Sequence, residues 1–196
     1  AGAYVLLNSR SSERCDVLEN KLTKLGLHVK GAVFDVTNKN AVAQYFSDED
    51  LTLDVLVNNA YSGGSGNIEF SDSEAYINSY EISVLAAHNL LSCALPNLRK
   101  GALHNGAASV INIASMYGLV SPDQGVYEDI SNVNPPFYGA SKAALLQWTR
   151  YAACEFGPEG IRVNSISPGP FPSPATQKNN AKFVSKLSKK VPLGRV

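Results

Sequence analysis

The amino-acid sequence predicts an α/β fold, a doubly wound parallel sheet with helices on both faces in three αβα layers. Short apolar runs of strand length alternate with helical stretches along the whole chain, which is the pattern of successive βαβ units. The runs are almost continuously apolar, as strands buried on both faces require. The sequence contains no internal repeat and no linker-like segment, so we expect residues 1–196 to form a single domain.

Composition limits the classes of function. Hydrophobic residues make up 44% and charged residues 17% of the 196 positions, which is typical of a globular protein. The formal net charge is zero and no basic stretch is clustered, which argues against a nucleic-acid partner. No apolar run approaches the length of a membrane span, and no signal peptide is visible. We therefore expect neither a membrane partner nor secretion.

The three cysteines, Cys15, Cys93 and Cys154, have no short spacing between them. An odd number of scattered cysteines favours reduced thiols in a cytoplasmic protein over a disulfide framework. The three histidines are isolated and lack metal-ligand spacing, so no metal site is predicted.

Five strands and five helices are expected in chain order. The strands are predicted over residues 3–7, 28–34, 53–57, 109–114 and 161–166. The helices are predicted over residues 13–25, 39–47, 72–95, 138–156 and 175–188. Apolar residues at helical spacing support the first helix, and Gly26 is its stop signal. The long stretch 72–95 ends before Pro96, and Gly157 and Gly160 close the helix 138–156.

Polar residues follow the predicted strands. These residues are Ser9, Arg10, Asp35, the run Asn58-Asn59-Ala60, Ser115, and Pro168-Gly169. Ligands of open parallel sheets bind beyond the carboxyl ends of the strands. The convergence of these segments at one edge therefore predicts a ligand site there.

Tyr138 and Lys142 lie four positions apart at the start of a predicted helix. This spacing places both side chains on one helix face. An ammonium near a phenol favours the phenolate, so the pair can form a proton donor or acceptor tuned toward neutral pH. The alternative is a surface helix with an ordinary tyrosine, because a single Tyr-x-x-x-Lys match is common by chance.

Taken together, Asn58-Asn59-Ala60, Ser115, Tyr138-x-x-x-Lys142 and Asn164-Ser165-Ile166-Ser167-Pro168-Gly169 resemble the short-chain dehydrogenase/reductase family, in the order in which that family has them. The resemblance implies a Rossmann-type domain and NAD(P)-dependent interconversion of a secondary alcohol and a carbonyl. It implies that Tyr138 exchanges the proton with the substrate oxygen and that Ser115 orients this oxygen. It implies that Lys142 favours the phenolate form of Tyr138 and binds the hydroxyls of the nicotinamide ribose.

The resemblance also implies the cofactor contacts. Asp35, with Val36 beside it, would meet the adenine, while Asn58 and Ala60 would line the cofactor. Pro168 and Gly169 would pass near the nicotinamide, and Ser173 would touch its amide or the phosphates. Ser9 stands where an acidic residue would select NAD, and Arg10 follows it. A guanidinium can donate hydrogen bonds to a 2′-phosphate, so NADP(H) is favoured. The alternative is NAD(H), with Arg10 stacked on the adenine.

The chain departs from the family at both ends. The family opens with a strand and a glycine-rich loop that places the pyrophosphate on a helix N-terminus, whereas this chain begins at Ala1-Gly2-Ala3. It stops at Val196, where family members continue into a further helix and strand. We therefore expect a domain truncated at both ends.

A third departure concerns the catalytic set. The helix 72–95 carries an asparagine in the family, thought to hold a water in a proton relay, and its place falls on Ser83 here. Asn78 lies five residues earlier, roughly 140° away around an ideal helix, which makes it a poor substitute. Ser83 is therefore the candidate fourth catalytic residue.

The segment between Ser115 and Tyr138 is long, since 23 positions separate the two residues. Its polar residues suit a hydroxyl-rich substrate, so a sugar or sugar derivative is a hypothesis. Two alternatives stay open, a nucleotide-sugar epimerase or dehydratase and a non-catalytic cofactor-binding scaffold. The two long helices predict a homodimer or homotetramer if the family's usual assembly holds.

Overall fold

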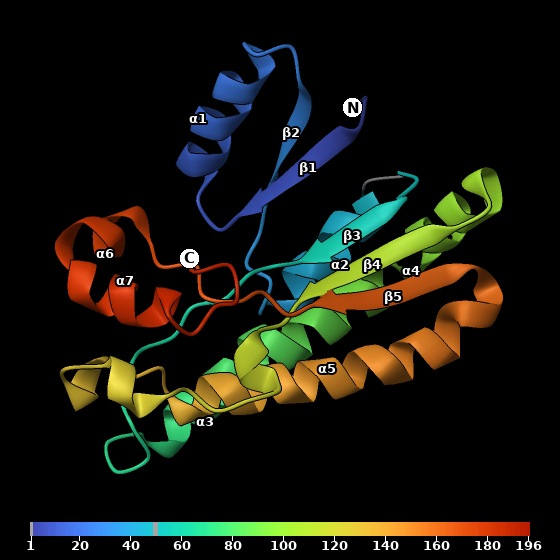
Figure 1. Ribbon diagram of the computed structural model, residues 1–196. Helices are drawn as coiled ribbons and strands as arrows, with labels where there is room; N and C mark the ends of the chain where they lie inside the picture. Colours follow the sequence, from blue (N-terminus) through green and yellow to red (C-terminus); the bar gives the residue numbers. More distant parts are fainter. Residues whose placement is uncertain (1, 49–50) are drawn as a thin grey trace.

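The computed structural model describes residues 2–48 and 51–196, and it confirms the α/β class with parallel strands (Figure 1). The strands are β1 (Tyr4–Ser9), β2 (His28–Val33), β3 (Val55–Asn58), β4 (Ala108–Ile113) and β5 (Ile161–Ile166). Tyr4 pairs with His28 at the start of β1 and β2, and Val55 pairs with Ser109 at the start of β3 and β4. All these pairings are parallel, so the carboxyl ends of paired strands lie together.

The strands fall into two sheets, whereas the sequence predicts one. One sheet is the pair β1–β2, and the other has the order β3–β4–β5. Figure 1 shows the pair beside the edge of the three-stranded sheet that β3 forms. In the described part of the chain no ladder joins β1 to β3. Val5 and Val57, on these two strands, are 45% and 51% exposed, as expected for edges without a partner strand.

Helices cover both faces of the β1–β2 sheet, as a doubly wound arrangement requires. On one face, α1 (Ser12–Thr23) approaches so closely that a Cβ on Gly31 would lie 3.0 Å from that of Cys15. The next residue, Ala32, points to the opposite face. There it packs in one buried cluster with Val42 of α2 (Lys39–Asp48) and with residues of α4 (Ala86–Asn105).

The β3–β4–β5 sheet is buried more deeply on one face than on the other. Along β4, Ala108, Val110 and Asn112 are buried, and the alternate residues are half-buried. The buried face packs against α4 and α5 (Pro136–Phe156), which supply Leu91, Leu98 and Ala152 to the core. Full burial of both faces, predicted from the apolar runs, is therefore not reached in this sheet.

One helical rod replaces the helix predicted over residues 72–95. It consists of α3 (Ser73–Tyr80), the π-helical turn η1 (Glu81–Leu85) and α4 (Ala86–Asn105). Pro96 lies inside α4 and does not end it. A proline within a helix costs roughly 3 kcal/mol. Buried residues on both sides of it, from Leu91 to Gly101, hold the helix against the sheet and offset that cost.

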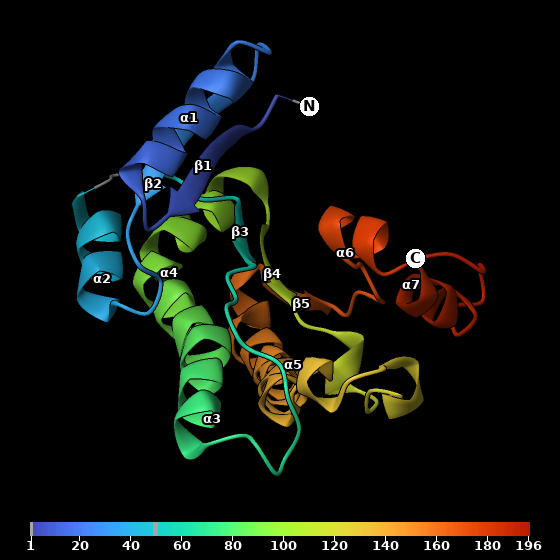
Figure 2. The ribbon, with the colours of Figure 1, turned by 90° about the vertical axis from the view of Figure 1, so that its left-hand side faces the viewer.

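The C-terminal segment forms two short helices where the sequence predicts one over 175–188. They are α6 (Pro174–Asn179) and α7 (Ala181–Ser188). Asn180 separates them, because its side chain accepts the Phe183 N–H and caps α7. Helix α7 lies beside the loop between β4 and α5, and α6 lies farther from that loop (Figure 2). Among the described residues, no helix combines the length and apolar character needed to cross a membrane.

The loop between β4 and α5 contains three 3₁₀ turns, and a fourth follows α5. They are η2 (Met116–Gly118), η3 (Gln124–Val126), η4 (Ile130–Asn132) and η5 (Gly157–Glu159). Ion pairs connect this loop to α7 and the residues that follow it. Lys182 lies 2.5 Å from Glu128, and Lys190 lies 2.7 Å from Asp123. The long loop is thus ordered by its own turns and by contacts with the C-terminal segment.

Candidate active site

A cavity of about 410 Å³ lies at the carboxyl ends of β1, β2 and β3. Five of the residues predicted to bind a cofactor line it, namely Ser9, Arg10, Asp35, Val36 and Ala60. These residues come from three strands far apart in the sequence. The cavity therefore lies where ligands of parallel sheets bind.

Arg10 and Asp35 face one another across this cavity. Arg10 Nη1 lies 3.6 Å from Asp35 Oδ2, and the Arg10 side chain is 72% exposed. Thr37 donates to the same carboxylate from its backbone N–H at 2.9 Å and from its hydroxyl at 2.7 Å. These two bonds, followed by the nearby guanidinium, hold the pKa of Asp35 below its usual value. The carboxylate is thus charged at neutral pH, while the exposed guanidinium keeps most of its donors available.

Tyr138 and Lys142 lie in the first two turns of α5, which begins at Pro136. Proline suits this first helical position because its fixed φ matches the helix and its missing N–H is not needed there. Lys142 is 3% exposed. Its ammonium donates to the Ile113 carbonyl at 2.7 Å and lies 5.7 Å from the centre of the Tyr138 ring. Burial lowers the pKa of Lys142 from 10.5 to about 8.

Ser115 follows β4 and is 6% exposed. Its hydroxyl accepts the Tyr117 N–H at 3.1 Å and begins the turn η2. The next residue, Met116, donates its N–H to the Pro168 carbonyl at 3.1 Å. This bond ties the loops after β4 and β5 together, so Ser115 and Pro168 lie on the same side of the sheet.

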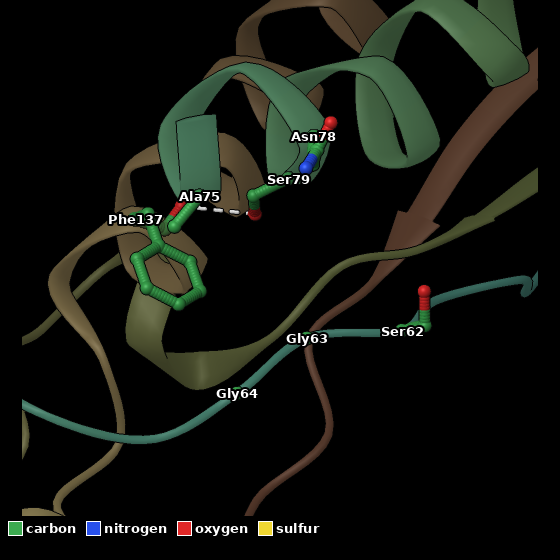
Figure 3. A pocket seen from close by; sticks show the side chains of 7 residues that line it. All are labelled: Ser62, Gly63, Gly64, Ala75, Asn78, Ser79 and Phe137. Atoms are coloured by element: carbon green, nitrogen blue, oxygen red, sulfur yellow. Dashed lines mark hydrogen bonds between the residues drawn. The ribbon is translucent and has the colours of Figure 1, made fainter. Parts of the chain in front are cut away.

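A second cavity, of about 270 Å³, lies between α3 and the glycine-rich loop after β3. Figure 3 shows Ser62, Gly63 and Gly64 on this loop facing Asn78 and Ser79 on α3, and it labels the two other lining residues, Ala75 and Phe137. The dashed line in the figure is the bond from the Ser79 hydroxyl to the Phe137 carbonyl, at 3.2 Å. Ser62 and Asn78 also line the larger cavity, so the two spaces adjoin.

Ser83 lies away from both cavities. It is 4% exposed, and its hydroxyl lies 3.3 Å from that of Ser141 on α5. Asn78 is exposed and lines both cavities. Ser79 and Ser83 both face α5, so the neighbouring Asn78 turns toward the open loop. The sequence favours Ser83 over Asn78 as the fourth catalytic residue, whereas of the two only Asn78 lines the cavities.

Six of the predicted cofactor residues do not line either cavity, namely Asn58, Tyr138, Lys142, Pro168, Gly169 and Ser173. Asn58 is 9% exposed and donates to Asn112 at 2.8 Å, and Asn112 donates to Thr149 at 2.8 Å. Ser173 is exposed and caps α6 by accepting the Thr176 N–H. Gly169 is exposed. Their roles toward a cofactor remain predictions.

Several residues of the site were not predicted. Asn8, Thr37, Tyr61, Glu81 and Ile82 line the larger cavity. Asn8, Thr37 and Tyr61 each lie next to, or two positions from, a predicted residue, so their place at a strand end was the available signal. Tyr117, half-buried two positions after Ser115, has a raised pKa, first because of burial and then because of Tyr127. In the described ranges, no three His, Cys, Asp or Glu residues are grouped so as to hold a metal ion.

A parallel α/β fold with a cavity at its strand ends and a buried lysine beside a tyrosine defines a class, the Rossmann-type dinucleotide-dependent oxidoreductases. A family model described as Enoyl-(Acyl carrier protein) reductase matches residues 1–196. The chain is 30% identical over 199 residues to the rhamnolipid-biosynthesis 3-oxoacyl-[acyl-carrier-protein] reductase of Pseudomonas aeruginosa, covering 100% of this chain and 74% of that protein. It is 26% identical over 194 residues to a 7alpha-hydroxysteroid dehydrogenase of Bacteroides fragilis, covering 95% and 69%.

Solved structures show the same fold. The Pseudomonas aeruginosa RhlG/NADP active-site complex superposes with a TM-score of 0.83 at 30% identity, covering 99% of this chain and 74% of that one. The L-sorbose reductase of Gluconobacter frateurii, complexed with NADPH and L-sorbose, gives a TM-score of 0.80 at 25% identity and the same coverage. The chain belongs to the short-chain dehydrogenase/reductase family. The prediction of an NAD(P)-dependent oxidoreductase acting on CH–OH groups is confirmed at the level of this family.

Proposed function

We propose that Tyr138 exchanges a proton with the oxygen of a secondary alcohol or ketone, that Ser115 orients this oxygen, and that Lys142 supports both Tyr138 and the cofactor. The observation that carries the proposal is the buried Lys142 ammonium, bonded to Ile113 on one side and facing Tyr138 on the other. A buried ammonium without a carboxylate is costly. Such a group is expected at a functional site.

The residues present fit NADP(H). An ammonium has three donors, and one of those of Lys142 goes to Ile113, which leaves two for ribose hydroxyls. Arg10 is exposed at the mouth of the larger cavity, where a guanidinium can bind a 2′-phosphate. When bound, the cofactor supplies or accepts the hydride. The protein's own residues hold the substrate oxygen at the Ser115 hydroxyl and move the proton at the Tyr138 hydroxyl.

We favour NADP(H) over NAD(H) because Arg10 is the cation nearest this cavity, and because similar structures were solved with NADP or NADPH. Asp35 moderates the argument, since its carboxylate already attracts Arg10. Calorimetry of both cofactors with the wild type and with Arg10→Ser tests the assignment. We expect the variant to lose about tenfold in NADPH affinity, or about 1.4 kcal/mol, and to bind NADH nearly as before. Equal losses for both cofactors would contradict a phosphate contact.

A sugar or sugar derivative is the proposed substrate. The long loop before α5 is rich in polar residues, and recognition by hydrogen bonds suits a hydroxyl-rich molecule. The similarity to a reductase solved with L-sorbose supports this choice. A panel of ketoses, a 3-oxoacyl thioester, an enoyl thioester and a hydroxysteroid tests it, with NADPH consumption as the readout. Turnover of only the thioesters or the steroid would remove the sugar proposal.

Tyr138→Phe tests the catalytic assignment. We expect turnover to fall by at least about a hundredfold while cofactor binding stays unchanged. Tyr151→Phe is the matched control, because Tyr151 lies on the same helix and is 68% exposed. A non-catalytic scaffold would show no turnover in the wild type and no difference between the variants. An epimerase or dehydratase would convert a nucleotide sugar without net consumption of NADPH.

We also propose a cytoplasmic homo-oligomer built on α3, α4 and α5. Exposed apolar side chains support it, including Ile77 (65%) on α3, Leu85 (45%) on the turn η1 that joins α3 to α4, and Tyr151 (68%) on α5. Sedimentation of the wild type against Ile77→Asp tests the assembly. A monomer in both cases would contradict it.

A further inference from the structure

Tyr61, on the loop after β3, contacts both proposed catalytic side chains of α5. Its ring lies edge-on to that of Tyr138, with centroids 4.8 Å apart and planes at 73°. The Lys142 ammonium lies 5.2 Å from the Tyr61 ring centre and 5.7 Å from the Tyr138 ring centre. The cation therefore lies within cation–π distance of both aromatic rings.

The Lys142 ammonium contacts one backbone carbonyl and the two rings. Lys142 is buried and donates to the Ile113 carbonyl, and no carboxylate contacts it in the residues that the structure describes. The titratable groups that face it are the phenols of Tyr61 and Tyr138, and Tyr117 lies near Tyr138. Attraction between a cation and an aromatic face grows as water is excluded. The Tyr61 ring thus stabilises the charged form of a group whose burial disfavours charge.

The hydroxyl of Tyr61 is anchored to the start of α5. It lies 3.1 Å from the Ser79 hydroxyl, which donates to the Phe137 carbonyl. Ser79 also lies 2.9 Å from the Ser141 hydroxyl, which donates to the Tyr138 carbonyl at 3.0 Å. Burial raises the pKa of Tyr61, so its phenol keeps the proton that it donates. Because the chain of hydroxyls ends on backbone carbonyls, it fixes positions and does not conduct a proton to solvent.

Gly63 allows this arrangement. A Cβ at Gly63 would overlap the Tyr61 hydroxyl and ring, whereas a Cβ at Gly64 would meet no atom within 4 Å. Tyr61 lines the larger cavity, and its partner Ser79 lines the smaller one.

We propose that Tyr61 is a positioning residue: its ring holds the Lys142 ammonium beside Tyr138, and its hydroxyl fixes that ring to α5 through Ser79. The inference rests on the proposed roles of Tyr138 and Lys142.

The test is a pH titration of Lys142 in the full chain without cofactor or substrate. ¹³C NMR of labelled lysine monitors the titration. Tyr61→Leu keeps an apolar cover and removes the aromatic face, so the Lys142 pKa is expected to fall by roughly half a unit or more. Tyr61→Phe keeps the aromatic face but loses the hydroxyl contact with Ser79, so its Lys142 pKa should lie between that of the wild type and that of Tyr61→Leu. Lys142→Arg assigns the resonance.

Gly63→Ala displaces the Tyr61 ring without changing a group that contacts the substrate, and Gly64→Ala is its control. We expect Gly63→Ala to shift the Lys142 titration in the same direction as Tyr61→Leu. Both variants should lower kcat by about tenfold or more, since small misplacements of reacting groups are costly. Gly64→Ala should leave both readouts unchanged.

Equal titration of Lys142 in the wild type, Tyr61→Leu and Gly63→Ala would overturn the inference whatever their activities. The titration needs no turnover. Failure of the proposed function would instead appear as an inactive wild type whose titration still shifts on removal of the ring.

Discussion

Replacing Lys142 by methionine should change how the stability of the fold depends on pH. Burial lowers the pKa of this lysine from 10.5 to about 8, so the folded chain binds the proton more weakly than the unfolded chain. Below pH 8 both states are protonated and the full cost of the buried charge is present. Between pH 8 and 10.5 the folded state has lost the proton and the unfolded state keeps it, so stability rises with pH. Above 10.5 the cost is gone.

The magnitude follows from the two pKa values. A Lys142 pKa of about 8 in the folded chain, against 10.5 in the unfolded chain, lowers the free energy of unfolding by about 3 kcal/mol at pH 7 and by about 2 kcal/mol at pH 9. Lys142→Met removes this term but leaves the Ile113 carbonyl without its donor, a pH-independent loss of about 1–3 kcal/mol. The stability at one pH therefore mixes two effects of opposite sign. The change with pH isolates the buried charge.

Urea unfolding of both proteins at pH 7, 8 and 9 measures the effect. The wild type should gain about 1 kcal/mol relative to Lys142→Met between pH 7 and pH 9. Lys178→Met, at an exposed position on α6, is the control and should show no such trend. A difference between wild type and Lys142→Met that is constant from pH 7 to 9 would refute the description of Lys142 as a buried ammonium with a depressed pKa.

Three further predictions concern the fold around the site. Gly101→Ala should destabilise the chain by about 1–3 kcal/mol in urea unfolding, because its Cβ would overlap the backbone carbonyl just before β3; Gly157→Ala, which meets no atom, should not. Thr149→Val should lower the free energy of unfolding by about 1–3 kcal/mol, because the buried side-chain amide of Asn112 loses its acceptor. Retention of wild-type stability would contradict this. The Lys190 ammonium is the main cause of the lowered pKa of Asp123, so the stabilisation by this ion pair is present above the unfolded pKa of 3.8 and is lost as pH falls through the lower folded pKa. Asp123→Asn should therefore speed proteolytic cleavage of the C-terminal segment at pH 7. Unchanged cleavage would show that the ion pair does not hold this segment.

Much of the fold was predictable because apolar spacing reports directly on burial. The strand and helix positions follow from short-range patterns, and each predicted strand appears within a few residues of its place. The predicted end of the long helix at Pro96 is wrong. The local cost of the proline is offset by burial of Leu98 and Gly101, which depends on a sheet formed by residues distant in sequence. Division into two sheets was equally hidden, since strand pairing is decided by tertiary contacts.

The site divides in the same way. Ser9, Arg10, Asp35 and Ala60 were predictable because parallel strands bring their carboxyl ends together. Tyr61 was not, although it directly follows Ala60. Its ring conformation depends on contacts with Ser79 on α3 and with Tyr138 on α5, which come much later in the chain. Likewise, the orientations of Ser83 and Asn78 depend on which face of the rod α3–η1–α4 packs against α5. The spacing of residues in the sequence does not determine this face.

Helix α5 connects the stability of the fold to the proposed chemistry. Ser141, Leu145, Thr149 and Ala152 form its buried stripe. Thr149 joins the amide network that reaches β4 and β3, and Ser141 joins the hydroxyls of α3 and η1. These contacts fix the height and rotation of the helix, and therefore the direction of Tyr138 and Lys142 one turn away. Substitutions in the stripe should then reduce turnover before they unfold the chain, because the cost of misplacing reacting groups rises faster than the loss of packing.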